Sequence, residues 1–194
     1  MLRILSGLSV LLIISLLQGC AGAVVGGAAA GASMAHDRRS VGTFVDDEII
    51  ELKATEILIS DKELFDQTHI NVTAYNNIIL LSGEAPSDAL RSKAFSLIAA
   101  IPKVRKVHNE LVLAAPSSLL TRSSDTWITT KAKINLINIK HIEGFDPTRV
   151  KVVSENGTVF LMGIITRNEA DAVVEASRTV KGVQRVVKLF EYLN

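Results

Sequence analysis

The chain has 194 residues, of which 48% are hydrophobic, and its formal net charge is +1. This composition excludes a disordered or fibrous protein and provides material for one or two small globular domains. A net charge so close to zero does not indicate a particular binding partner, and it does not favour nucleic acid.

The first residues have the pattern of a secretory signal peptide. Arg3 precedes an apolar run over residues 4–17, which is short for a membrane span but has the length of a signal-peptide core. The run ends in LLQGC, and its Gly19-Cys20 pair resembles the bacterial lipobox. That resemblance implies cleavage before Cys20 and acylation, for example by palmitate, of its sulfur and its new amino group. We therefore expect a signal peptide over residues 1–19 and lipidation at Cys20.

An alternative for the same segment is an ordinary signal peptide that leaves an unpaired thiol at Cys20, the only cysteine in the chain. A lone thiol without a disulfide partner is unfavourable in an exported protein. Ala21, and not Asp, follows the cysteine. By resemblance to lipoproteins, this residue implies sorting to the periplasmic face of the outer membrane.

Residues 20–45 are rich in Gly and Ala and have no sustained polar face. We interpret them as a flexible tether between the lipidated cysteine and the folded part. The alternative is a short helix of small residues close to the bilayer.

Beyond the tether the sequence repeats itself. The segment INVTAYNNIILLSG at residues 70–83 aligns with VKVVSENGTVFLMG at residues 150–163, at a constant offset of eighty residues. Each copy continues with a helical pattern and a β-patterned segment, so the order is helix, strand, strand, helix, strand. We expect one domain over residues 46–113, a linker over residues 114–124, and a second domain over residues 125–194.

Both repeated segments predict a β-hairpin. Alternating apolar residues lead into a turn at Asn76-Asn77 or Asn156-Gly157, and an apolar strand follows. Asn-Gly between two β-patterned runs is a strong hairpin signal. The second strands end in Gly83 and Gly163, to which we assign a structural role in chain geometry rather than phosphate binding, because neither lies in a glycine-rich loop.

The helical patterns before the hairpins share their spacing. We predict that Asp47 and Asp125 are the N-caps of these two helices. The matching positions are Asp47, Ile50, Lys53, Ala54 and Leu58 in the first copy, and Asp125, Ile128, Lys131, Ala132 and Leu136 in the second.

This order of elements, the glycine after the second strand and the GVQRV entry to the last strand resemble the BON domain of bacterial envelope proteins. The segments RSVGT, INVTAY, DTWITTK and VFLMG further resemble the DolP family of dual-BON outer-membrane lipoproteins. The resemblance implies an α+β fold with two tandem domains, each a small mixed three-stranded sheet backed by two helices. It also implies a phospholipid-binding lipoprotein that supports envelope integrity and gathers at cell-division sites.

The two copies differ in charge. Residues 46–113 carry eleven acidic and seven basic residues, whereas residues 125–193 carry eight acidic and ten basic residues. The contrast is sharpest in the first helices, because DDEIIELKATEIL has five acids and one lysine, and DTWITTKAKINLINIK has one acid and three lysines. Only the second copy therefore has the charge to approach an anionic surface.

The first helix of the second copy has apolar residues on two sides. Ile128, Ala132, Leu136 and Ile139 form a stripe that we assign to the domain core. On the other side we expect a lipid-binding surface for anionic phospholipid, because an indole and outward apolar groups next to lysines suit the headgroup boundary. Its residues are Trp127, Ile134, Ile137, Lys131 and Lys133.

Glu56 stands at the position of Ile134 in the first copy, so we expect this outer apolar surface in the second copy alone. Two alternatives remain open. The surface could pack against the linker or the first copy, or it could bind a protein partner of envelope assembly or cell division.

The sequence predicts no enzymatic site, cofactor or metal site. The four histidines lie far apart, and no pair of them has ligand spacing with a carboxylate or thiol on one element. Acylated Cys20 is no nucleophile, and no Ser-His-Asp arrangement follows from the spacings.

Overall fold

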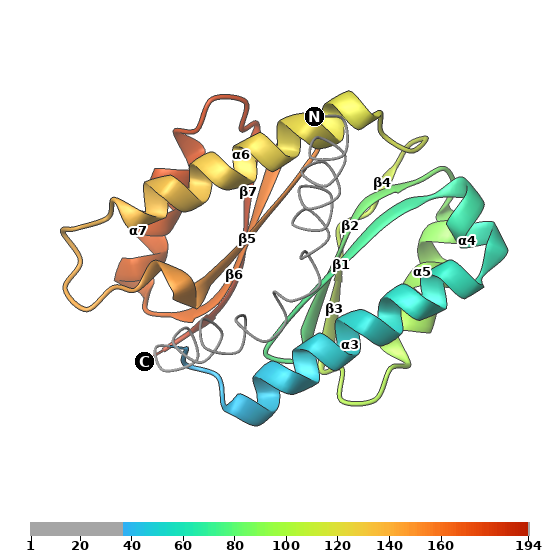
Figure 1. Ribbon diagram of the computed structural model, residues 1–194, viewed down its shortest axis with the longest axis horizontal. Helices are drawn as coiled ribbons and strands as arrows, with labels where there is room; N and C mark the ends of the chain where they lie inside the picture. The colour runs from blue at the N-terminus through green and yellow to red at the C-terminus, as the bar shows by residue number, and fades with distance from the viewer. Residues whose placement is uncertain (1–36, 194) are drawn as a thin grey trace, which may run out of the picture. The chain divides into compact units, whose positions relative to one another are not determined.

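The computed structural model describes residues 37–193, and Figure 1 shows the order of its helices and strands. The signal peptide, Cys20 and most of the expected tether lie outside the described residues. Both repeated domains belong to one compact unit that begins at Arg38. Within residues 37–193, no helix is both long and apolar enough to cross a membrane.

The first domain has two helices before its hairpin and one after it. Its elements are α3 (Val41–Ser60), α4 (Lys62–Gln67), β1 (His69–Tyr75), β2 (Ile78–Ala85), α5 (Asp88–Ala99), β3 (Lys106–Asn109) and β4 (Val112–Leu113). β1 pairs antiparallel with β2, from His69 opposite Glu84 to Tyr75 opposite Ile78. β3 pairs parallel with β2, and β4 continues this pairing after a two-residue break.

The second domain repeats this plan with a longer closing strand. Its elements are α6 (Leu119–Ile137), the 3-10 helix η2 (Pro147–Arg149), β5 (Val150–Glu155), β6 (Thr158–Ile165), α7 (Arg167–Arg178) and β7 (Arg185–Tyr192). β5 pairs antiparallel with β6, and β7 pairs parallel with β6 along its whole length. The predicted α+β fold with two mixed sheets is thus confirmed, with one additional short strand in the first sheet.

Both hairpin turns form where the sequence predicts them. Asn76 and Asn77 in the first turn, and Asn156 and Gly157 in the second, all have positive φ between 49° and 70°. Two consecutive residues with positive φ match the right-handed twist of the strands in a two-residue hairpin, and Asn and Gly tolerate this conformation best.

The predicted N-caps are wrong. α3 begins after Ser40 and α6 after Ser118, and each serine hydroxyl accepts a hydrogen bond from the backbone N–H three residues later. The helices therefore begin within the segments expected as tether and linker. Asp47 and Asp125 lie inside the helices and are buried.

The two buried aspartates hold the hairpin turns instead. Asp125 accepts hydrogen bonds from the backbone N–H groups of Asn156 and Gly157, both at 2.9 Å. Asp47 accepts the equivalent bonds from the first turn, both at 2.7 Å. The two helices keep the predicted spacing, but the aspartate carboxylates accept hydrogen bonds from turn donors rather than from the free N–H groups of a helix end.

Each domain has its own apolar core between helices and sheet, and a third cluster lies between the two sheets. In each sheet, alternate residues point to opposite faces, so one face packs on the helices and the other is free to meet the other domain. The third cluster contains Tyr75, Ile78, Leu80, Phe160 and Met162. This apolar contact makes the two domains one body, and it leaves the outer faces of the helices to the solvent.

Candidate functional site

The inner face of α6 packs as predicted. Ile128, Ala132 and Leu136 are at most 2% exposed, and Ile139, which follows the helix, is buried as well. These residues belong to the core cluster of the second domain, together with apolar residues of β5, β6 and α7. The stripe fixes the rotation of the helix about its axis, so its opposite face points outward.

The outer face of α6 carries an apolar ridge. Trp127 is 45% exposed, Ile134 43% and Ile137 54%, although all three are large hydrophobic side chains. None of them is sealed against the linker or the first domain, so that alternative from the sequence does not hold for these three side chains. Whether they bind lipid stays a prediction.

The ridge is longer than the sequence indicated. Leu119 and Leu120, in the first turn of α6, are 78% and 81% exposed. At 100° per residue, Leu120, Trp127 and Ile134 fall on one line along the helix, because steps of seven residues return to nearly the same direction. We call Leu119, Leu120, Trp127, Ile134 and Ile137 the α6 ridge. Its 19-residue helix is about 28 Å long.

Sequence reasoning missed the two leucines because it assigned residues 114–124 to the linker. The available signal was the pair of serines before them, since Ser118 is an N-cap followed by a helical pattern.

Two exposed lysines flank the ridge. Lys131 Nζ lies 5.8 Å from the centroid of the Trp127 ring, so the cation rests beside the indole face. Lys133 lies on the flank that faces the first domain, where it lines a cleft with Ile137 and Phe44. Lys140 follows the helix and is exposed as well.

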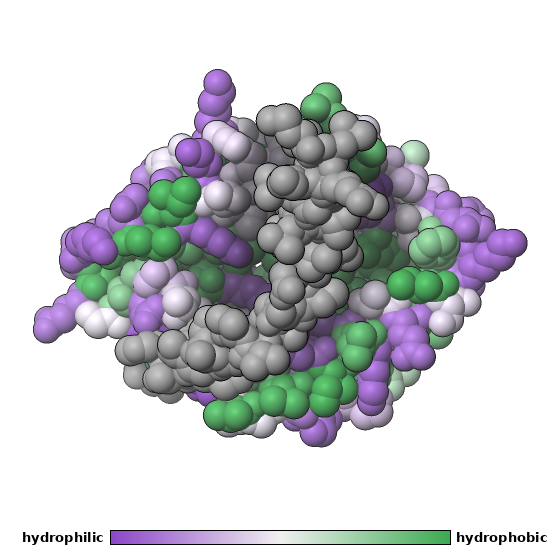
Figure 2. Space-filling view, viewed as in Figure 1, coloured by the Kyte–Doolittle hydropathy of each residue, from purple (hydrophilic) through white to green (hydrophobic). Residues whose placement is uncertain are grey.

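The first domain departs from one expectation. α3 also presents a row of exposed apolar side chains, namely Val41, Val45, Ile49, Leu52 and Ile59. Figure 2 shows apolar residues exposed along α3 as well as along α6. Outward apolar residues are therefore not special to the second domain, and the expectation that they are is wrong. The charge is what differs, because Glu48 and Glu56 accompany the row on α3 and lysines accompany the α6 ridge.

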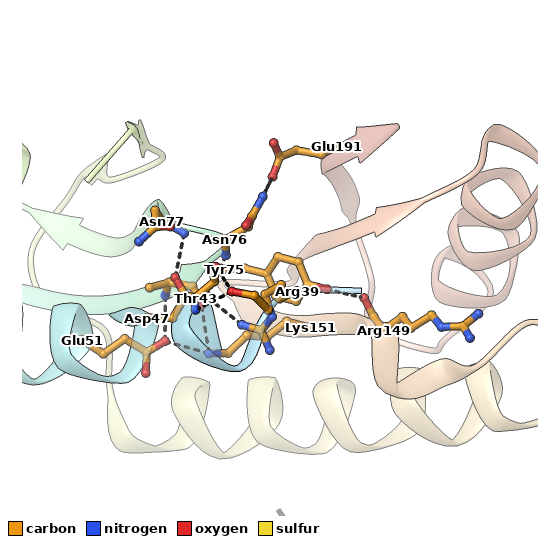
Figure 3. A network of polar contacts seen from close by, with 12 residues as sticks. Arg39, Thr43, Asp47, Glu51, Tyr75, Asn76, Asn77, Arg149, Lys151 and Glu191 are labelled. Carbon is orange, nitrogen blue, oxygen red and sulfur yellow. Dashed lines mark hydrogen bonds and ion pairs between the residues drawn. The ribbon is translucent and has the colours of Figure 1, made fainter. Parts of the chain in front are cut away.

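A polar network holds α3 and the first hairpin against the second domain (Figure 3). Lys151, from β5, forms an ion pair of 2.7 Å with Glu51 of α3. Glu191, at the end of β7, accepts a hydrogen bond from the Asn76 side chain and lies 3.0 Å from Arg105. α6 is thus presented by a two-domain body and not by an isolated module.

Two titratable groups at the other end of the domain interface are perturbed. Burial raises the pKa of Glu155 to about 7, against the hydrogen bond from Asn71, and the nearby carboxylate of Glu84 raises it further. Burial and the field of Arg122 lower the pKa of His69, although Glu84 acts in the opposite direction. The imidazole is therefore neutral near pH 7.

Gly83 and Gly163 occupy equivalent places, two residues before the ends of β2 and β6, so neither ends its strand as the sequence predicted. Gly83 has a φ of +117°, and a Cβ there would lie 1.9 Å from the carbonyl oxygen of His69. A Cβ on Gly163 would lie 2.7 Å from the carbonyl oxygen of Arg149. Both distances are too short for any side chain, so the backbones of the paired strands approach each other closely at these points.

Comparison with known proteins accounts for the repeated fold. The BON domain family matches residues 46–115 and 124–194. The outer membrane lipoprotein DolP of Haemophilus influenzae is 36% identical over 178 residues, which cover 92% of this chain and 91% of that protein. The chain belongs to the DolP family of dual-BON proteins.

A second relative is the 21 kDa hemolysin of Actinobacillus pleuropneumoniae. It is 38% identical over 157 residues, which cover 81% of this chain and 79% of that protein. Among solved structures, the C-terminal domain of CdsD from the type III secretion system of Chlamydia trachomatis matches 76% of this chain and 67% of that one, with 17% identity and a TM-score of 0.29. A similarity this low carries no argument about function.

Membership of the DolP family confirms the predicted family and supports an outer-membrane lipoprotein. It does not by itself assign a role to the α6 ridge.

Proposed function

We propose that this chain is a non-enzymatic outer-membrane lipoprotein that rests the α6 ridge on anionic phospholipid and thereby supports envelope integrity, with enrichment at division sites. The observation that carries the proposal is the exposure of Trp127, Ile134 and Ile137 beside Lys131 and Lys133 on one helix face. An amphipathic helix of this kind lies in the plane of the interface, with its apolar side among the acyl chains and its lysines at the headgroups.

The magnitudes favour a weak, reversible contact. Each lysine near an anionic surface contributes about 1 kcal/mol. Burying the exposed half of one large apolar side chain contributes roughly 1 kcal/mol. Two lysines with Trp127, Ile134 and Ile137 thus give roughly 5 kcal/mol before ordering costs, which corresponds to a dissociation constant of roughly 0.1–1 mM. A lipid anchor at Cys20 would compensate for this weakness by keeping the ridge close to the membrane.

Charge separates the α6 ridge from the apolar row on α3. Both helices offer apolar side chains, but Glu48 and Glu56 on α3 would be repelled by anionic headgroups. The same acidic and apolar row favours a second candidate function, in which the first domain binds a basic protein partner of envelope assembly or cell division. The two functions use opposite domains and are separable by mutation.

Cosedimentation with liposomes tests the lipid contact. The full chain carrying Cys20→Ser, so that acylation does not dominate, is mixed with vesicles of phosphatidylglycerol or of phosphatidylcholine. We expect binding to the anionic vesicles only, and the double variant Trp127→Glu/Ile134→Glu should remove it. The matched control is Val45→Glu/Leu52→Glu on α3, which should leave binding unchanged. Equal binding by a folded α6 variant and by the wild-type sequence would refute lipid docking through the ridge.

A further inference from the structure

Three strands bring an imidazole and two carboxylates together at one end of the domain interface. His69 begins β1, and Glu84 lies directly opposite it on β2. Glu155 ends β5 of the second domain, and its Oε1 lies 3.9 Å from His69 Nε2. One nitrogen or oxygen from each of the three side chains lies within 4.8 Å of the others.

Both carboxylates are buried, Glu84 to 2% exposure and Glu155 to 5%. Two buried carboxylates so close together are costly while both are ionised, unless a positive charge accompanies them. Among residues 37–193, neither of them forms an ion pair with a lysine or an arginine. The charge of Arg122 of α6 acts weakly on Glu155, but its guanidinium donates to the backbone carbonyl and the hydroxyl of Ser117 instead.

Hydrogen bonds hold the two carboxylates in place. The amide of Asn71 donates to Glu155 Oε2 at 2.7 Å, and the amide of Asn156 donates to Glu84 Oε1. The backbone N–H of Ser117 donates to Glu84 Oε2 at 3.0 Å. The Asn71 amide nitrogen also lies 3.3 Å from His69 Nε2, so this ring nitrogen faces the carboxylates. Outer hydrogen bonds of this kind orient the ligands in metal sites and fix which oxygen points inward.

The cluster has an approach from solvent and a hydroxyl without a partner beside it. A cleft of about 510 Å³ is lined by His69, Asn71 and Glu155, and α6 forms its other wall. Ser82 lies opposite Asn71 on the face of β2 that also carries Glu84. It is fully buried, and within the described part of the chain its hydroxyl finds no hydrogen-bond partner.

We propose that His69, Glu84 and Glu155 form a binding site for a divalent transition metal of the zinc type, with the fourth position open to the cleft. An imidazole with carboxylates selects Zn²⁺ and its neighbours over Mg²⁺ and Ca²⁺, which prefer all-oxygen sites. Ligand bonds of about 2.0–2.2 Å place the ligand atoms roughly 3.5 Å apart, so small rotations of the three side chains close the site.

Such a site would join the two domains. Its first two ligands come from the hairpin of the first domain and the third from the second domain, so the ion would bridge the interface at the end opposite Glu191. Metal binding to the native state alone then raises the stability of the whole chain, because the unfolded chain has no assembled site.

Calorimetric titration of the full chain in detergent with ZnCl₂, after treatment with EDTA and its removal, tests the proposal. We expect one zinc ion per chain, a melting temperature that rises with zinc, and no comparable response to MgCl₂. His69→Ala and Glu155→Gln should each lower the zinc affinity by at least about tenfold, the lower limit typical even of outer-shell changes.

Matched controls come from residues of the same interface outside the three-residue cluster. His108 on β3 is half-buried like His69, and Glu110 lies 3.6 Å from Arg185 across the same interface. His108→Ala and Glu110→Gln should bind zinc like the wild type. Circular dichroism without metal shows whether each variant folds, and Glu155→Gln keeps the shape of the side chain. The proposal is overturned if zinc does not bind one to one, or if folded His69→Ala and Glu155→Gln bind it as tightly as the two controls.

Discussion

Replacing Asp125 by Ala tests the role that the structure gives to the buried aspartates. The carboxylate is only 5% exposed and accepts two hydrogen bonds of 2.9 Å from the turn N–H groups of Asn156 and Gly157. Hydrogen bonds to a charged group contribute about 1.5–3 kcal/mol each, and their loss leaves two turn donors without this acceptor. We expect the free energy of unfolding to fall by about 3–5 kcal/mol. The melting temperature of a chain of this size should then drop by roughly 10 °C.

The control for this experiment is Ser118→Ala, which removes the N-cap of α6. It should lower the free energy of unfolding by about 1 kcal/mol. Urea unfolding followed by circular dichroism measures both variants against the wild type, with the same slope expected for all three because the folded contacts are otherwise unchanged. If Asp125→Ala costs no more than Ser118→Ala, the aspartate acts like an ordinary helix cap and our account of the hairpin is incorrect.

Two further predictions concern Gly83, near the end of β2, and the buried Glu155. Gly83→Ala should lower the free energy of unfolding by about 3 kcal/mol or more, because the φ of +117° is strained for alanine and the new Cβ would contact the His69 carbonyl. A melting temperature equal to that of the wild type would contradict this prediction. Burial raises the pKa of Glu155 from 4.5 to about 7, so the native state keeps this proton to a higher pH than the unfolded state does. Stability should therefore fall as pH rises from 4.5 to 7, by at most about 3 kcal/mol. The Glu155→Gln variant, measured in EDTA beside the wild type, should lose this part of the pH dependence of stability. An unchanged stability profile in the variant would argue against the assignment to Glu155.

Local patterns were sufficient for the repeat, the hairpins and the core face of α6. Asn156-Gly157 between alternating apolar residues specifies a two-residue turn, and the spacing of Ile128, Ala132 and Leu136 specifies the buried side of a helix. These features depend on neighbours within a few residues in the chain, so sequence reasoning reaches them. It also identified Trp127 as a residue that the core does not need.

The first residues of the helices were harder to predict from the sequence, because Ser118 and Asp125 are both good N-cap residues and only their surroundings in the fold distinguish them. Asp125 accepts hydrogen bonds from a hairpin turn 31 and 32 residues later in the chain, and these contacts exist only after the strands have paired.

The sequence by itself determined the two α+β units, the turn positions and the opposite charges of the two first helices, since each is written in short-range periodicity or composition. Only the tertiary structure decided which apolar surfaces are covered. Phe160 and Leu80 meet between the sheets, whereas the row on α3 stays exposed. It also decided that His69, Glu84 and Glu155 converge, because residues from three strands of two domains become neighbours only through strand pairing and domain packing, whose register no local pattern encodes.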